Sequence, residues 1–198
     1  MEVQSGVPLP EPAHSSRTQP PPSNEHRAPG WVRLALENIG LVLVYALTGM
    51  LALLLARGTA LASPVWPAAG IAFALVFVRG TAYLPGILLG SLATNLPSIL
   101  RGNHAFSIEV AIAVSIAIGT TLGILTGTLL VRRVIGRRPR LIDARQILLF
   151  LALAGSIAGA VSASIGTTVM VVSDIISSSQ AASSWFTWWV GDTLGIVV

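Results

Sequence analysis

Long apolar segments, joined by short polar connections, run through most of this chain, and they do not alternate apolar with polar residues. In a lipid bilayer every backbone polar group must find a partner within a helix or a closed barrel, and continuous apolar runs favour helices over barrel strands. Only 10% of the residues are charged, whereas a typical soluble domain has about 25%. The sequence therefore predicts an all-α integral membrane protein, folded as a polytopic helical bundle. Its six expected transmembrane helices cover about residues 34–56, 60–78, 82–100, 106–131, 146–172 and 185–198.

The arginines predict how these helices are oriented. All twelve cations of the chain are arginines, and six of them lie in the segment 132–145. Loops rich in basic residues stay in the cytoplasm, so this segment and, with six crossings, the N-terminus are expected to be cytoplasmic. Arg57 and Arg101 are then the two arginines expected outside. This topology also explains the sequence pI near 11.0 without a nucleic-acid partner.

Two regions of the chain differ in composition. Residues 1–30 hold more than half of the twelve prolines, together with polar and charged residues and no apolar periodicity. They are therefore predicted to be a disordered cytoplasmic tail. Residues 31–198 form the expected transmembrane domain. Its last segment has about 14 residues, whereas about 20 are needed to cross a bilayer, so we expect this domain to be incomplete at its C-terminus.

The chain lacks the residues that several kinds of enzyme and metal site require. The chain has no cysteine and three histidines. His14 and His26 lie in the tail, and His104 lies in a loop. No Ser–His–Asp set, metal-ligand cluster or phosphate-binding loop can be recognised. We therefore expect no enzymatic activity, no metal and no cofactor in this chain.

One acid stands in the apolar segment at the end of the chain. On a helix Asp192 shares a face with Trp185, Trp188 and Trp189, because the four residues are spaced i, i+3, i+4 and i+7. A charged side chain at the centre of a bilayer costs roughly 2.5–3.5 kcal/mol. Such an acid needs a partner, a water-filled cavity or a ligand. Contact with a ligand and contact with other helices remain equal alternatives for these four residues.

Two more features predict polar groups at membrane depth. Trp66 stands between Pro64 and Pro67, so the second helix is expected to start irregularly and to leave carbonyl groups without backbone donors. Asn95 can make two donor and two acceptor contacts in the third helix. We expect Trp66, Pro67 and Asn95 to lie near Asp192. An interfacial tryptophan anchor and a helix-to-helix amide bond are the structural alternatives.

Glycines recur at intervals of four in three of the expected helices. Small residues at this spacing let two helices approach each other closely in a membrane. We therefore predict helix packing along the rows that consist of Gly86 and Gly90, of Gly119, Gly123 and Gly127, and of Gly155 and Gly159.

Four blocks of sequence resemble one known family. They read SPVWPAAGIA at 63–72, YLPGILLGSLATN at 83–95, IGTT at 165–168 and WWVGDTLG at 188–195. Together they resemble, over about residues 40–198, the membrane-associated sensor domain of the first type, in the MASE family. A glutamate often stands in that family where this chain has Gly123, so any role of that carboxylate is absent here or moved to Glu109.

The resemblance implies an N-terminal input module of a bacterial signalling protein. Members are multi-pass domains of the inner membrane with about eight spans, and they precede a histidine kinase, a diguanylate cyclase or a cyclic-di-GMP phosphodiesterase. The closing spans and the output domain would then be missing from this chain. The expected partners are the lipid bilayer, an unidentified small ligand, a second copy of the chain and that cytoplasmic output domain.

A transporter for small molecules or ions is the alternative function. Intramembrane acids and broken helices also suit carriers. Against this class, the chain has one deep acid, Asp192, and no recognisable inverted repeat. A sensory input domain is therefore the preferred interpretation.

Overall fold

The computed structural model describes residues 29–56, 65–99, 105–136 and 143–198. These residues are helical with short connections and contain no strand, so the predicted all-α fold is confirmed. The predicted tail lies outside the described residues except for its last two positions, and so do Arg57 and Arg101. The elements are α1 (Gly30–Leu55), α2 (Pro67–Arg79), η1 (Thr81–Tyr83), α3 (Leu84–Ile99), α4 (Phe106–Val134), α5 (Ala144–Phe150), η2 (Leu151–Ile157), α6 (Ala158–Val172), η3 (Ser178–Gln180) and α7 (Ala181–Val197).

The helices differ in whether they are long enough to cross a membrane. Within the described ranges three qualify by length and composition, namely α1, α4 and the continuous helix Ala144–Val172 that α5, η2 and α6 form together. The helix α2 has 13 residues, which is about 20 Å against a hydrocarbon core of about 30 Å. With 16 and 17 residues, α3 and α7 are also shorter than those three. The count of six crossings and the cytoplasmic N-terminus therefore stay predictions.

Two helix starts differ from the predicted positions. The helix α2 begins at Pro67, where a proline is tolerated because the first N–H groups of a helix have no partner inside it. The helix α7 begins at Ala181, before the predicted start at Trp185. Ser177 and Gln180 form a capping box at the start of η3, and this turn continues directly into α7.

The fifth segment was expected to be a regular helix, but its middle is wider. Residues Leu151–Ile157 form a π-helical stretch between α5 and α6. This stretch contacts both α4 and α7. Short π-helical stretches inside α-helices are rare and often lie at functional sites.

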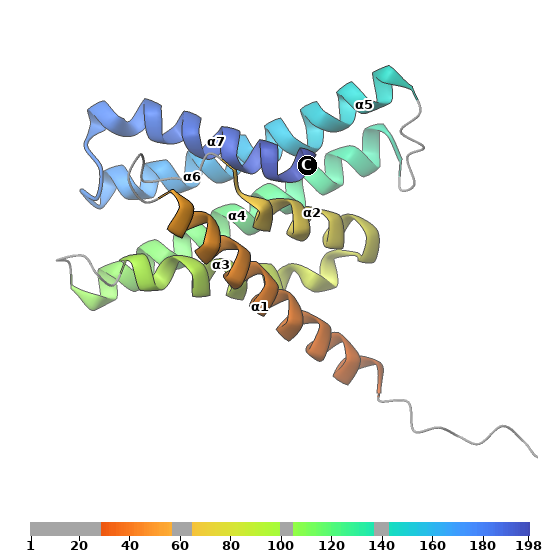
Figure 1. Ribbon diagram of the computed structural model, residues 1–198, viewed down its shortest axis with the longest axis horizontal. Coiled ribbons are helices and arrows are strands. Elements are labelled where there is room, and N and C mark those ends of the chain that lie inside the picture. The colour runs from red at the N-terminus through yellow and green to blue at the C-terminus, as the bar shows by residue number, and fades with distance from the viewer. Residues whose placement is uncertain (1–28, 57–64, 100–104, 137–142) are drawn as a thin grey trace, which may run out of the picture.

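The long helix α4 is central and α1 is peripheral. Half of the apolar window of α4 is buried, 50% against 22% for α1. The helix α4 packs against α3, α6 and α2, whereas α1 crosses the bundle diagonally and its first turns project from it (Figure 1). Leucines on the outer face of α1 are exposed, among them Leu43, Leu47 and Leu51. In a membrane this face contacts lipid.

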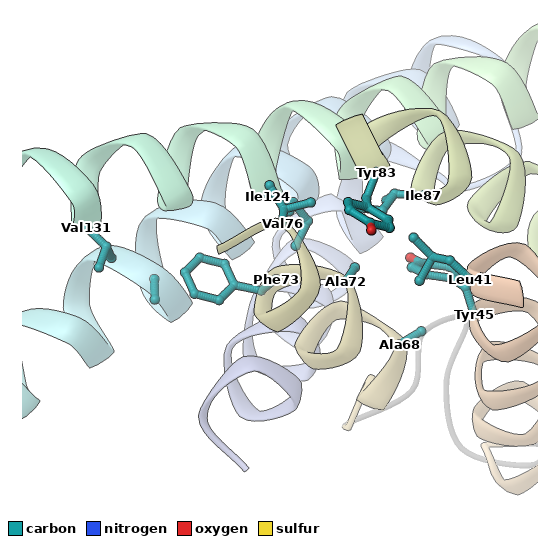
Figure 2. Packing of buried hydrophobic residues seen from close by; sticks show 11 residues of the cluster. Leu41, Tyr45, Ala68, Ala72, Phe73, Val76, Tyr83, Ile87, Ile124 and Val131 are labelled. Carbon is teal, nitrogen blue, oxygen red and sulfur yellow. The ribbon is translucent and has the colours of Figure 1, made fainter. Parts of the chain in front are cut away.

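The short helix α2 lies between α1, α4 and α7 and contributes most to the apolar core. Figure 2 shows its side chains between Leu41 and Tyr45 of α1 on one side and Val131 of α4 on the other. At its C-terminal end, Arg132 of α4 donates hydrogen bonds to the backbone carbonyls of Val76 and Phe77, at 2.8 and 2.7 Å. The Val76 carbonyl also accepts the backbone N–H of Gly80, whereas the Phe77 carbonyl is one of those that the end of a helix leaves without a partner inside it.

Candidate functional site

The irregular start of α2 is docked on the middle of α7. The backbone N–H of Trp66 donates to the carbonyl of Gly191 at 2.9 Å. Further along the two helices, Gly70 packs directly on the backbone carbonyl of Gly195, and Gly195 packs on the carbonyl of Trp66. No side chain would fit at either glycine without moving a backbone. The sequence prediction that Trp66 and Pro67 lie near Asp192 therefore corresponds to a direct contact between α2 and the residue before Asp192.

Asp192 itself is buried, with 3% of its surface exposed. The hydroxyl of Ser162 on α6 lies near its carboxyl but has no hydrogen-bond partner among the described residues. The Tyr45 hydroxyl lies within range of the Asp192 charge and also interacts with Ser91 and Thr120. These five residues come from α7, α6, α1, α3 and α4. We call them the Asp192 cluster.

The Asp192 cluster contains no positive charge. In the described ranges both ion pairs involve Glu37, near the start of α1. No described residue donates a hydrogen bond of normal length to the Asp192 carboxyl, and Trp66 Nε1 donates instead to the Tyr45 hydroxyl, at 3.3 Å. The grooves along α1–α2 and α6–α7 do not include Asp192 among their lining residues. The described polar groups near the acid are thus hydroxyls, which can donate as well as accept hydrogen bonds.

The three tryptophans of α7 pack against the helix Ala144–Val172. The Trp185 indole N–H donates to the Ser164 hydroxyl at 3.0 Å, and the Trp189 indole N–H donates to the Ser156 carbonyl at 2.8 Å. The rings of Trp185 and Trp189 stack with their centroids 5.7 Å apart. The Trp188 ring lies directly on a glycine of α6. Both hydrogen-bonded N–H groups are therefore used within the bundle.

Asn95 contacts this cluster through Ser91, on its own helix. Its amide nitrogen donates to the Ser91 carbonyl at 2.9 Å and to the Ser91 hydroxyl at 3.4 Å. The Ser91 side chain, which α3 contributes to the Asp192 cluster, is fully buried. Sequence reasoning missed Tyr45 and Thr120. The signal for Tyr45 was available, since it is a lone phenol within an apolar segment and one of two tyrosines in the chain.

Each glycine row lies against one neighbouring helix. A methyl group added at Gly90 would come within 2.8 Å of Tyr45 Cβ, and one added at Gly123 within 2.5 Å of the Ala158 carbonyl oxygen. Gly123 therefore has no room for a larger side chain, while Glu109 is buried in the first turn of α4. In turn, the row of Gly86 and Gly90 faces α1, the row of Gly119, Gly123 and Gly127 faces α6 and η2, and the row of Gly155 and Gly159 faces α7.

Long apolar helices around a buried polar cluster define a membrane protein whose interior, and not its aqueous surface, carries the candidate site. The MASE1 family model matches residues 36–198. The chain belongs to the MASE1 family of membrane-associated sensor domains, which are sensory input domains of signalling proteins. No curated protein and no solved structure matches it.

Proposed function

We propose that this chain is the multi-pass sensory input domain of a bacterial inner-membrane signalling protein. It perceives a small ligand at the Asp192 cluster and regulates a cytoplasmic output domain, which is a histidine kinase, a diguanylate cyclase or a cyclic-di-GMP phosphodiesterase. Catalysis belongs to that output domain. Family membership supports the sensory role. The observation that carries the choice of site is the buried Asp192, which lies near the hydroxyls of Ser162 and Tyr45 and forms no ion pair with a described residue.

The geometry suggests how a signal would change the packing. A ligand that donates hydrogen bonds to the Asp192 carboxyl would compete with Ser162 for it. Such a ligand would change the distance between α6 and α7. The contacts of α7 with α2 and α6 run through glycines and backbone atoms, so a shift of α7 repacks whole helices and not single side chains. The ligand must bind one packing more tightly than the other, because equal affinity for both would shift nothing.

The test is an Asp192→Asn variant in the protein that joins this domain to its output domain. Asparagine keeps the shape of the side chain and removes its charge. We expect the output, measured as cyclic-di-GMP turnover or kinase autophosphorylation, to stay at one level under conditions that modulate the parent protein. Asp174→Asn is the matched control, because Asp174 is an exposed acid with a φ of 54°, which asparagine tolerates. Unchanged regulation together with unchanged thermal stability would refute the proposed role of Asp192.

Transport is the second candidate function, favoured by one observation. The helix α2 is a short helix whose N-terminus meets the chain next to a buried acid, an arrangement that carriers use at their binding sites. Purified protein in proteoliposomes would take up solute if the chain were a carrier. Uptake that depends on Asp192 would replace the sensory proposal.

A further inference from the structure

A groove runs between α1 and α2, and it includes neither the Asp192 cluster nor the three tryptophans of α7. Its walls are apolar along most of its length, and one end is charged. This end carries Glu37 and Arg79 beside the phenol of Tyr83. The rest of the groove is lined by Gly40, Leu41, Val44, Ile71 and Leu75.

Gly40 leaves the groove open. A methyl group added at this position would meet nothing within 4 Å. The glycine rows described above instead lie directly against a neighbouring helix, so Gly40 plays a different part in the structure. Above it Val44 is exposed and Ile71 is half-buried. The groove is therefore open and largely apolar, and it lies beside the face of α1 that is expected to contact lipid.

The charged end of the groove has an excess of one positive charge. Arg33 Nε lies 2.9 Å from one Glu37 carboxylate oxygen, and the Tyr83 hydroxyl donates to the other. Arg79 reaches Glu37 at 3.5 Å and makes no hydrogen bond within the described residues. Its side chain is 50% exposed, so most of its five N–H donors are free to bind a further acceptor. Arg133 lies at the same end of the bundle, next to the arginine that holds the end of α2.

Apolar walls that lead to a guanidinium have the chemistry of a phospholipid site. We propose that this groove binds one anionic phospholipid, with its headgroup phosphate at Arg79 and an acyl chain along Gly40 and Ile71. Charge favours an anionic over a zwitterionic lipid, because two guanidiniums face one carboxylate and basic pockets between membrane helices bind acidic headgroups. The expected occupant is a lipid and not another helix, because the neighbouring outer face of α1 is lined by exposed leucines on an apolar helix long enough to cross a bilayer.

The test uses the purified full chain in mixed micelles that contain equal amounts of phosphatidylglycerol and phosphatidylcholine. Native mass spectrometry counts the lipids that each variant retains. We expect the parent protein to retain phosphatidylglycerol preferentially. Arg79→Gln should lower the ratio of the two retained lipids about fivefold, the effect of one cation near a membrane surface. Gly40→Leu should remove the retained lipid whatever its headgroup, because the leucine side chain would occupy the groove, starting from a Cβ that meets nothing within 4 Å.

Arg133→Gln is the matched control, because Arg133 is exposed at the same end and does not line the groove. We expect it to retain lipid as the parent does. If it loses as much phosphatidylglycerol as Arg79→Gln, the binding is a general charge effect and the site is wrong. Parent-like retention in both Arg79→Gln and Gly40→Leu also refutes the proposal. If Gly40→Leu instead converts a dimer to a monomer, the groove is an interface between two copies. Thermal unfolding of each variant shows that it is folded.

Discussion

Replacing Gly123 by alanine tests whether backbone contact between α4 and α6 holds the bundle together. The added methyl carbon would lie 2.5 Å from the Ala158 carbonyl oxygen, whereas ordinary contacts begin at 3.4 Å. The obstacle is backbone at the junction of η2 and α6, so no rotamer change relieves it. The two helices must separate by about 1 Å, a gap that forfeits up to about half of the attraction between facing atoms. Overpacking of this kind costs about 1–3 kcal/mol.

Gly40→Ala is the control for the intrinsic effect of the substitution. Alanine favours a helix over glycine by about 1 kcal/mol, and at Gly40 the new methyl group meets nothing within 4 Å. We expect Gly40→Ala to match or exceed the melting temperature of the parent protein in detergent, and Gly123→Ala to melt about 5 °C below Gly40→Ala. Equal melting temperatures for the two variants would show that α4 and α6 are not in the close contact that the structure describes.

Two further substitutions test contacts at opposite ends of α2. Arg132→Gln removes a guanidinium that donates two hydrogen bonds to backbone carbonyls and lies 5.8 Å from the centre of the Phe77 ring, so we expect a loss of about 1.5–3 kcal/mol in thermal unfolding, with Arg133→Gln unchanged. Tyr45→Phe removes the acceptor of the Trp66 indole N–H and should cost about 0.6–1.5 kcal/mol, seen as lower protection of that indole in hydrogen exchange. A parent-like result in either assay would remove the corresponding contact from the description of the site.

Hydropathy and small-residue spacing were enough to predict the helical fold, because both follow directly from the physics of the bilayer. The positions of α1 and α4 follow from apolar runs with no competing signal. The start of α7 precedes the predicted position because apolar content, which sets the predicted start at Trp185, does not reveal the local cap that Ser177 and Gln180 form. The π-helical stretch Leu151–Ile157 leaves no mark in hydropathy, since one extra residue in a turn does not change the composition.

The candidate site was predictable along α7 and at the start of α2, but the partners from the other helices were not. Spacing alone places Asp192 and the tryptophans on α7, and the Trp66–Pro67 pair indicates a broken helix start. Which polar groups face Asp192 depends on how α1, α4 and α6 rotate against α7, and that rotation is set by packing of many weak contacts. For this reason the sequence does not single out Tyr45 and Thr120, whereas Asn95 contacts the cluster through the Ser91 hydroxyl of its own helix.

The helix α2 links the two ends of the bundle in a way that bears on signalling. Its N-terminus is joined to α7 beside Asp192 by a backbone hydrogen bond and by glycine contacts that leave no room for a side chain. At its C-terminus Arg132 donates hydrogen bonds to two backbone carbonyls, and Arg79 belongs to the charged end of the groove between α1 and α2. A helix of 13 residues behaves as a short rigid rod of about 20 Å. If a ligand displaces α7 at Gly191, α2 must therefore move with it. The displacement then reaches Arg79, at the charged end of the groove, through α2 itself.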